Sequence, residues 1–222
     1  MVRLEDIQKD VRIVLDHNEV QASLAELGED QLQLDSIIEN QVEVAARTVM
    51  LMSPRSYINW QVLSAGAGSA STGNAYYVIP LPTDFLRFGA AKMSDWKRGV
   101  DTYYNMHDPE YSMQQSDFAG VRATRRKPAA FICEKAEGGS EVQLYPCTSG
   151  DELEYMTYCK QPKLVEGKID ITETLYQPFI YTTAAFVAEV LKDTDKNNEL
   201  LSCAKTLLTN PDEVVAQAPT EG

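Results

Sequence analysis

The side chains that most often carry catalysis or bind metals are sparse in this sequence of 222 residues. Of its two histidines, His17 lies in Leu-Asp-His-Asn at the end of an expected helix, and His107 lies in the expected loop Asn-Met-His-Asp-Pro. Neither has a second histidine at the H-x-x-x-H spacing with which one helix face binds a metal. We therefore expect no metal site, and a histidine-based catalytic triad has few candidates.

The four cysteines are spaced too widely for a zinc ribbon or a thioredoxin-type redox motif. Cys133, Cys147, Cys159 and Cys203 include no C-x-x-C pair. An even number would permit two disulfides, but the sequence has no Asn-x-Ser/Thr sequon, and Met1-Val-Arg-Leu-Glu-Asp lacks the order of a signal peptide. Because Cys133 and Cys159 lie in strand-like runs, we expect buried, reduced thiols.

Two further patterns could serve chemistry, the glycine-rich stretch 66–74 and the carboxylate pair Glu152 and Glu154. The stretch has no lysine for a phosphate-binding loop, and a strand rather than a helix follows it, so we expect a flexible hairpin tip or a loop ordered on assembly. The two glutamates stand at strand spacing and share one face, which favours a solvated or salt-bridging face over acid–base catalysis. We therefore expect no catalytic residue and no cofactor, and the protein is not expected to be an enzyme.

Charge is distributed unevenly along the chain. The 33 acidic and 20 basic residues give a formal net charge of −13, which separates into −7 for residues 1–54, +3 for 55–133 and −9 for 134–222. The acidic excess argues against general nucleic-acid binding. Two interpretations remain: a solvated surface, or acidic and basic faces that meet different neighbours, or each other, across a repeated subunit contact. In the second, the cluster Arg122, Arg125, Arg126 and Lys127 is the candidate subunit contact.

Hydrophobic periodicity predicts helices near both ends of the chain. Apolar residues recur at helical spacing over 3–16 and over about 30–52, where Ser53-Pro54 ends the pattern. Thr172 is a candidate N-cap for a helix that runs to about residue 192, and a final helix covers 195–208. No apolar run reaches the roughly 20 residues that span a bilayer.

The middle of the chain has the patterns of β-strands. Aromatic and β-branched residues predict strands over 57–63, 76–82, parts of 85–100, 128–135, 141–146 and 152–159. Gly138-Gly139 predicts a hairpin between the fourth and fifth of these. Asp108 and Pro109 are typical of the start of a short helix.

The order helices, strands, helices predicts an α+β fold. We expect the N- and C-terminal helices to pack as one bundle, with a large antiparallel β insertion between them. The expected parts are N-terminal helices over 1–56, a sandwich-like β-rich insertion over 57–168, C-terminal helices over 169–209, and a polar tail over 210–222 that is disordered or docks on a partner.

Three patches, taken with this order of elements, resemble the head–tail adaptor proteins of short-tailed phages, the family that includes tail tubular protein A. Residues 79–88, Ile-Pro-Leu-Pro-Thr-Asp-Phe-Leu-Arg-Phe, resemble the family's Leu-Pro-x-Asp-Phe step into its β region. Residues 127–131, 141–146 and 153–164 resemble its strand series, and 175–190 resemble its closing helix. Tyr57-Ile-Asn-Trp stands where the family has a Gly-Trp-x-Phe-Asn-type approach, and the basic cluster has no family counterpart.

The resemblance implies a structural virion protein that forms an oligomeric ring, usually twelvefold, beneath the portal. Such a ring joins the portal to the tail and extends the DNA channel, with genomic DNA as a passing, weakly contacted strand. The implied partners are other copies of the chain, the portal and other tail proteins, with no membrane, and the implied location is the portal–tail junction after synthesis in the host cytoplasm. By the same analogy the portal contact is Asn210, Pro211, Asp212, Glu213, Val214 and Val215.

Two alternatives remain open. The chain is also compatible with another phage stopper or tail-completion protein, and with an unrelated cytosolic enzyme whose site lies in the β region.

Overall fold

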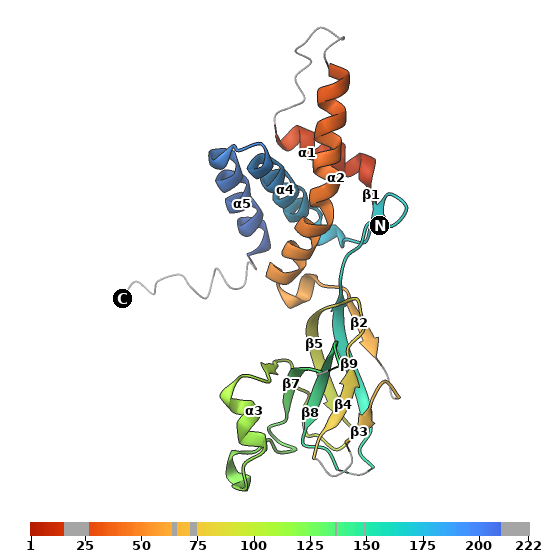
Figure 1. Cartoon of the computed structure of the whole chain (residues 1–222), viewed down its shortest axis with the longest axis vertical. Coiled ribbons are helices and arrows are strands. Elements are labelled where there is room, and N and C mark those ends of the chain that lie inside the picture. The colour runs from red at the N-terminus through yellow and green to blue at the C-terminus, as the bar shows by residue number, and fades with distance from the viewer. Residues whose placement is uncertain (16–26, 64–65, 72–74, 136, 149, 210–222) are drawn as a thin grey trace, which may run out of the picture. The chain divides into compact units, whose positions relative to one another are not determined.

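The computed structural model describes residues 1–15, 27–63, 66–71, 75–135, 137–148 and 150–209 (Figure 1). Over these residues the protein is of the mixed α+β class, as predicted, with five α-helices and several β-sheets. The chain divides into two units: Met1–Asn59 with Pro162–Gly222 forms the first unit, and Trp60–Gln161 forms the second unit. Each unit is described by itself below.

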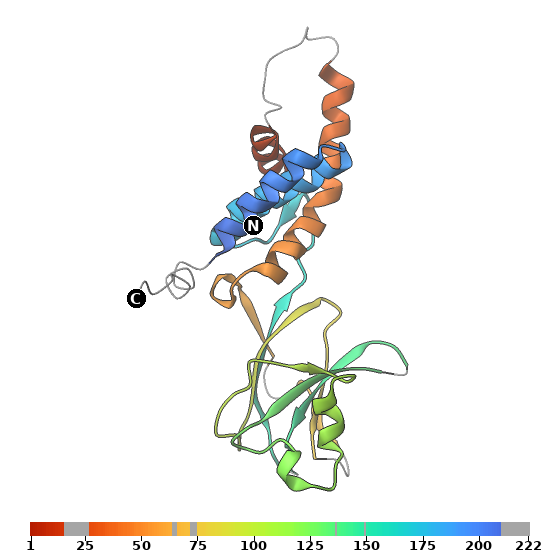
Figure 2. The same cartoon turned by 90° about the vertical axis from the view of Figure 1, so that its left-hand side faces the viewer.

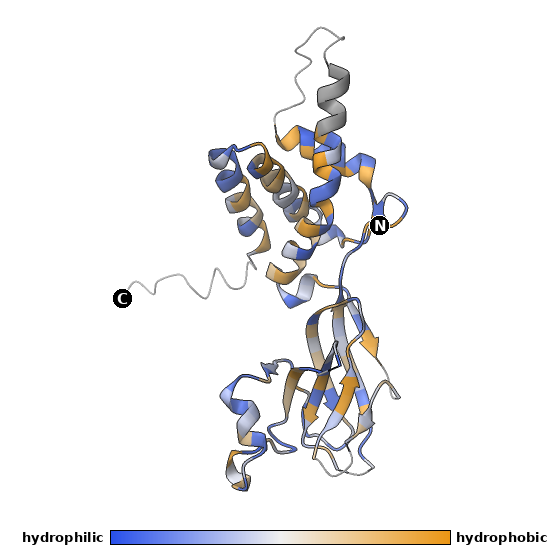
Figure 3. Cartoon of the chain, viewed as in Figure 1, coloured by the Kyte–Doolittle hydropathy of each residue, from blue (hydrophilic) through white to orange (hydrophobic). Residues whose placement is uncertain are grey.

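Helices dominate the first unit. Its described helices are α1 (Leu4–Val14), α2 (Leu27–Met52), α4 (Glu173–Val190) and α5 (Thr194–Leu208). Helices α1, α2 and α5 all pack against α4, and Figure 2 shows α4 and α5 side by side. Polar and apolar residues alternate along α1, whereas α4 is mostly apolar (Figure 3). These are the patterns of a surface helix and of a central helix.

One apolar core joins these helices. Its fully buried members include Ile7, Val11, Val42, Val49, Leu175 and Phe179. The small residues Ala184, Ala185 and Ala188 of α4 are also buried and let the neighbouring helices approach closely. Burial of apolar area, at about 25 cal/mol per Å², is the main term that stabilises such a core. None of the described helices has a stretch that is long and apolar enough to cross a membrane.

The helix ends agree with most of the predicted signals. Ser53 and Pro54 end α2 as predicted. Asp193, which was not predicted as a cap, caps α5 by accepting a hydrogen bond from the Lys196 amide at 3.0 Å. Thr172 occupies the N-cap position of α4, but its hydroxyl donates to the carbonyl of Tyr57 at 3.1 Å instead of capping the helix. The prediction therefore gave the correct N-cap residue, but the Thr172 side chain does not make the predicted capping hydrogen bond.

A short two-stranded ribbon in the first unit has no counterpart among the predicted elements. Strand β1 (Val2–Arg3) pairs antiparallel with β10 (Lys168–Ile169). The amide of Leu4 also donates to the carbonyl of Gly167 at 2.8 Å. Two-residue strands carry no measurable periodicity, so only the pairing in space defines them.

Two sheets form the second unit. One has the order β2 (Trp60–Leu63), β9 (Leu153–Lys160), β5 (Phe85–Met93). The other has the order β3 (Ser69–Ala70), β4 (Tyr77–Pro80), β8 (Ser140–Tyr145), β7 (Ala129–Glu134), β6 (Tyr104–Asn105). Buried residues of both sheets, such as Ile79, Phe88, Leu144 and Met156, belong to one apolar cluster. Residues of β4, β5, β7, β8 and β9 therefore face a shared interior.

Local turn chemistry is confirmed where the chain reverses between β7 and β8. These strands pair antiparallel, and Gly138 and Gly139 have φ values of +90° and +85°. Such left-handed conformations favour glycine, because a side chain would be strained there. The predicted short helix is also present as α3 (Pro109–Gln114), although Asp108 accepts from the Asn105 amide at 2.6 Å and makes no side-chain cap.

Three predictions for the β region need correction. Strand β6 pairs parallel with β7, so this sheet is not purely antiparallel; the chain between them crosses over through α3. The predicted strand over 57–63 begins only at Trp60, because Arg55–Tyr57 forms a 3-10 turn behind Pro54. Part of the glycine-rich stretch 66–74 is the strand β3, which pairs with β4 as a hairpin would, while residues 72–74 lie outside the described residues.

Candidate basic docking surface

The candidate site is on the second unit, where the chain between β5 and β7 folds over the five-stranded sheet. Phe131 of β7 is fully buried, and the rings of Tyr104 and Tyr111 pack against it with centroid distances of 5.6 and 5.4 Å. The hydroxyl of Tyr111 also donates to Gln143 Oε1 at 3.2 Å. These contacts fix β6 and α3 against the sheet, and so they position the basic segment that follows.

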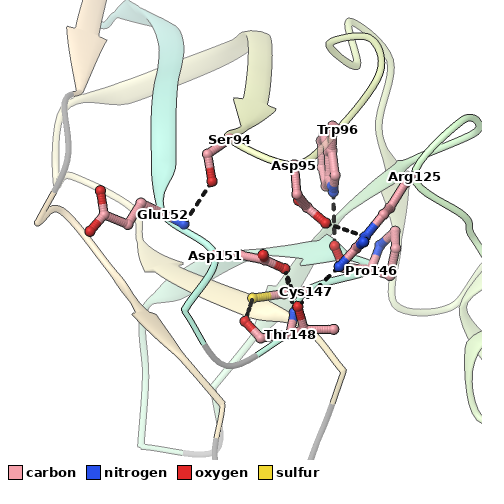
Figure 4. Close-up of polar contacts among 9 residues, drawn as sticks. All are labelled: Ser94, Asp95, Trp96, Arg125, Pro146, Cys147, Thr148, Asp151 and Glu152. Carbon is pink, nitrogen blue, oxygen red and sulfur yellow. Dashed lines mark hydrogen bonds and ion pairs between the residues drawn. The ribbon is translucent and has the colours of Figure 1, made fainter.

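The predicted cluster is fixed to the interior through Arg125 (Figure 4). The guanidinium of Arg125 forms an ion pair with Asp95 through Nε, and its Nη2 donates to Thr148 Oγ1 at 3.2 Å. Thr148 is held in turn by Asp151, whose carboxylate accepts from the threonine hydroxyl at 2.8 Å. The Asp95 side chain retains only 17% of its exposure, so this pair is partly shielded from water.

The turn after β5 is held by Trp96 and Ser94 (Figure 4). Trp96 is buried, and its indole Nε1 donates to the carbonyl of Pro146 at 2.8 Å. The amide of Ser94 donates to the carbonyl of Glu152 at 2.9 Å, and the Glu152 amide donates to Ser94 Oγ at 3.2 Å. The chain therefore leaves this turn in a fixed direction, with Lys97 and Arg98 next.

Two basic segments that are distant in the sequence lie together. The amide of Lys97 donates to the carbonyl of Arg125 at 2.9 Å, which brings the first segment beside the second. We call the five exposed cations that result the basic surface: Lys97, Arg98, Arg122, Arg126 and Lys127. Within the described part of the chain these five cations form no ion pair, although Arg122 Nε donates to the carbonyl of Ser116 at 2.5 Å. They are free to meet carboxylates of a partner.

A groove runs through the basic surface. It has a volume of about 410 Å³, and its lining includes Arg98, Arg122 and Lys127 together with Asp101 and Glu110. Three large apolar side chains that line it are also exposed, and we call these the apolar rim: Tyr104, Met113 and Val121. An exposed patch that combines apolar area with unpaired charge is typical of a protein-interaction surface.

The charge of the two units differs strongly. The first unit has 21 acidic and 10 basic residues, a formal net charge of −11, whereas the second unit has 12 acidic and 10 basic residues, a net charge of −2. The basic surface is therefore a local excess in a molecule that is otherwise acidic. It is suited to an acidic partner, and the first unit of another copy has that character.

The residues that were considered from the sequence for catalysis or metal binding are not part of the basic surface. Glu154 forms an ion pair with Lys92 at 2.6 Å, which confirms a salt-bridging face for that carboxylate. His107 is exposed in its loop, and His17 lies outside the described residues. In the described ranges no group of three or more His, Cys, Asp or Glu side chains could hold a metal ion.

None of the four cysteines, all of which lie in the described ranges, forms a disulfide, and three of them are buried. Cys133 and Cys159 are buried as predicted, Cys147 is buried as well, and Cys203 is exposed. Burial, followed by the nearby carboxylates of Asp151 and Asp95, raises the pKa of the Cys147 thiol to about 11. Burial raises the pKa of Cys159 to about 11 as well. Both thiols are protonated at neutral pH, so neither is an activated nucleophile.

A second hollow lies in the first unit, where α2 and α5 end. It has a volume of about 300 Å³ and is lined by Met52, Ser53, Pro54, Lys205, Leu208 and Thr209. Leu51, Met52 and Leu207 are exposed apolar residues of the same two helix ends. The predicted portal contact, residues 210–215, follows Thr209 in the sequence and lies outside the described residues.

The structure separates the predicted cluster into two roles and enlarges it. Arg122, Arg126 and Lys127 belong to the basic surface, whereas Arg125 is held by Asp95 and Thr148. Lys97 and Arg98 were not among the predicted contact residues. Their adjacency was the only signal, and nothing in the sequence indicated that they meet the other cations.

Comparison with known protein families and with curated protein sequences finds no match. The function is therefore inferred from the residues and their arrangement.

Proposed function

We propose that this protein is a structural subunit of a phage particle, which assembles into a ring that joins the portal to the tail and extends the DNA channel. The observation that carries the proposal is the charge separation between the units: the second unit has five exposed cations without an ion pair to any described residue, and the first has a net charge of −11. The family resemblance of the sequence supplies the ring and its place in the virion.

Neighbouring subunits of a closed ring meet through two different faces of the same chain. Such a heterologous contact needs complementary faces on one molecule, and an acidic face and a basic face meet that need. In this proposal the N- and C-terminal helices act as one bundle, and the β-rich second unit is an insertion that supplies the basic face.

The portal contact is assigned to residues 210–215, Asn-Pro-Asp-Glu-Val-Val. This segment follows Thr209 in the sequence, and Thr209 lines the hollow of about 300 Å³. Leu51 and Leu207 are exposed at the same helix ends and give the portal apolar area to cover.

Passage of DNA agrees with the acidic composition. Affinity for phosphates comes from clustered cations, and a chain of net charge −13 binds DNA weakly overall. A channel through which a genome slides requires weak contacts of this kind. The raised pKa values of the buried thiols Cys147 and Cys159 also fit a protein without nucleophilic catalysis.

The proposal is tested by imaging. The purified chain is mixed with the portal protein of its own phage and examined by negative-stain electron microscopy, and the masses of the assemblies are measured by mass photometry. A ring of this chain on the portal supports the proposal. A chain that remains unbound at high concentration, with a portal that is itself assembled, contradicts it.

A truncated chain of residues 1–209 is the matched control for the portal contact. Loss of portal binding with an unchanged circular dichroism spectrum is the expected result. Unchanged portal binding would remove residues 210–215 from the contact while leaving the ring proposal in place.

A further inference from the structure

The turn that joins α4 to α5 is a second exposed feature with mixed apolar and charged character. We call residues 189–199 the α4–α5 corner; Figures 1 and 2 show it where the two adjacent helices meet. Val190 and Leu191 are large apolar residues that retain 48% and 46% of their exposure there. They stand outside the core of the first unit and have no described apolar cover.

The corner is rigid, because backbone hydrogen bonds close it. The amides of Leu191 and Asp193 donate to the carbonyls of Val187 and Ala188 at 3.0 and 2.9 Å. Lys192 between them adopts a left-handed φ of 65°, which turns the chain sharply into α5. A fixed protrusion loses little conformational entropy when it binds.

The charge of the corner is acidic. Its exposed carboxylates are Glu189, Asp193, Asp195 and Glu199, against the two cations Lys192 and Lys196. Lys196 lies 3.8 Å from Glu199 and compensates part of that charge. The other three carboxylates, Glu189, Asp193 and Asp195, lie within five residues of the exposed Val190 and Leu191 in the sequence.

We propose that the α4–α5 corner of one copy binds the groove of the basic surface on a neighbouring copy, an inference that rests on the proposed ring assembly. Val190 and Leu191 would pack on Tyr104, Met113 and Val121 of the rim. The corner carboxylates would meet Arg98, Arg122 and Lys127 of the groove.

The two features match in three respects. One is a protruding turn and the other is a groove of about 410 Å³. Both combine exposed apolar side chains with charge, and the charges are of opposite sign. Since they lie on different units of the same chain, the contact is heterologous and can repeat from copy to copy around a ring.

Nucleic acid fits the groove less well. The apolar rim residues Met113 and Val121 have no role in a phosphate contact. A protein partner with both carboxylates and aliphatic side chains accounts for the cations of the groove and for its apolar rim.

Single-cysteine cross-linking tests the contact between separate copies. In a Cys203→Ser background, which removes the exposed native thiol, Val121→Cys is placed beside the groove and Val190→Cys is placed on the corner. The two variants, one of them with a mass tag, are mixed at high concentration and low salt and then oxidised. Val62→Cys of β2, which is 65% exposed and outside the rim, replaces Val121→Cys as the control.

We expect the disulfide between Val121→Cys and Val190→Cys chains to form at least about fivefold faster than the control pair, and the excess to disappear at 1 M salt, where the Debye length is only about 3 Å. Charge reversal of the groove, R122E with K127E, should abolish the excess. Reversal of the corner charge in the Val190→Cys chain, E189K with E199K, should restore the faster cross-linking to the charge-reversed groove.

Equal rates for the test pair and the control pair overturn the inference. So does tight, salt-sensitive binding of a 20-base-pair DNA duplex that R122E with K127E abolishes, because the groove would then serve nucleic acid. Cross-linking of rings imaged on the portal separates the two proposals. Rings that form without the 121–190 cross-link refute the contact alone, whereas a cross-link without any ring on the portal refutes the proposed function alone.

Discussion

Arg125 and Asp95 form an ion pair that fixes the basic segment to the β-rich second unit. Arg125 is half exposed, whereas the Asp95 side chain retains only 17% of its exposure. Two further hydrogen bonds hold Arg125 in place. Its Nη2 donates to Thr148 Oγ1, and its carbonyl accepts from the Lys97 amide. This one arginine therefore connects the basic segment to the second unit, while its neighbour Arg126 is exposed and forms no ion pair with any residue that the structure describes.

Removal of Arg125 should destabilise the second unit. We expect Arg125→Ala to lower its free energy of unfolding by about 1–2 kcal/mol, between the values for exposed and buried ion pairs, because Asp95 loses its cation in a partly shielded place. Arg126→Ala is the matched control and should change it by less than about 0.5 kcal/mol. Both tryptophans, Trp60 and Trp96, lie in the second unit, so urea unfolding followed by tryptophan fluorescence reports on that unit alone. Equal effects of the two variants would show that the ion pair contributes nothing.

Thr157 provides a hydrogen-bond acceptor for a backbone amide at an irregularity of the three-stranded sheet. The register between β5 and β9 shifts between Phe88 and Ala91, and Thr157 Oγ1 accepts from the Ala90 amide at 2.8 Å within that bulge. Thr157→Val keeps the shape and removes the acceptor, so we expect a loss of about 1–3 kcal/mol in the free energy of unfolding. Thr157→Ser keeps the hydroxyl, so its free energy of unfolding should fall clearly less than that of Thr157→Val. Urea unfolding of the pair, read by tryptophan fluorescence, is the measurement; a larger loss for serine than for valine would contradict this role.

Tyr176 makes the first unit sensitive to alkaline pH. Its hydroxyl donates to Asp10 Oδ2 at 2.6 Å, and burial, followed by this bond and the charge of Asp10, raises its pKa above the ordinary value of 10.0. Because the folded state holds the proton more tightly, its contribution to stability is complete below pH 10 and is lost as pH rises above 10. The helical circular dichroism signal, which comes mainly from the first unit, should therefore melt at lower temperature above pH 10.

Tyr176→Phe is the control for that pH dependence. It should lower the stability of the first unit by about 1 kcal/mol at pH 7, because the hydrogen bond to Asp10 is lost. The decline above pH 10 should also be shallower than in the unmodified chain. An identical decline in both proteins would assign the alkaline transition to other groups.

Thiol reactivity should distinguish Cys203 from the other cysteines. Cys203 is exposed, whereas Cys133, Cys147 and Cys159 are buried and burial is the largest cause of their raised pKa values. With Ellman's reagent at pH 8 we expect one fast-reacting thiol in the native chain, none in Cys203→Ser, and four after denaturation in the unmodified chain. Two or more fast thiols in the native chain would contradict the burial of the other three.

The elements with strong local signals could be predicted from the sequence. Helices α1, α2, α4 and α5 follow from apolar residues at helical spacing, and the β7–β8 hairpin follows from alternation around Gly138-Gly139. In each case neighbours in the sequence are also neighbours in space, so the pattern contains the information. The stop at Pro54 and the mixed α+β class belong to the same group.

The short and non-local elements could not be predicted. Strands β1, β6 and β10 have two residues each, which is too short for a period, and the bulge between Phe88 and Ala91 exists only relative to β9. The parallel β6–β7 pair depends on where α3 leads the chain, not on the composition of β6.

The basic surface also combines features that follow from the sequence with features that depend on the tertiary structure. The sequence by itself determined that the chain is acidic, that its middle is basic, and that the cluster at residues 122–127 is its densest group of cations. Only the tertiary structure decided that Arg125 pairs with Asp95 while Lys97 and Arg98 join the remaining cations in the basic surface. The reason is physical: charge is a property of the residue, but pairing and exposure depend on which distant segment the backbone hydrogen bonds bring beside it.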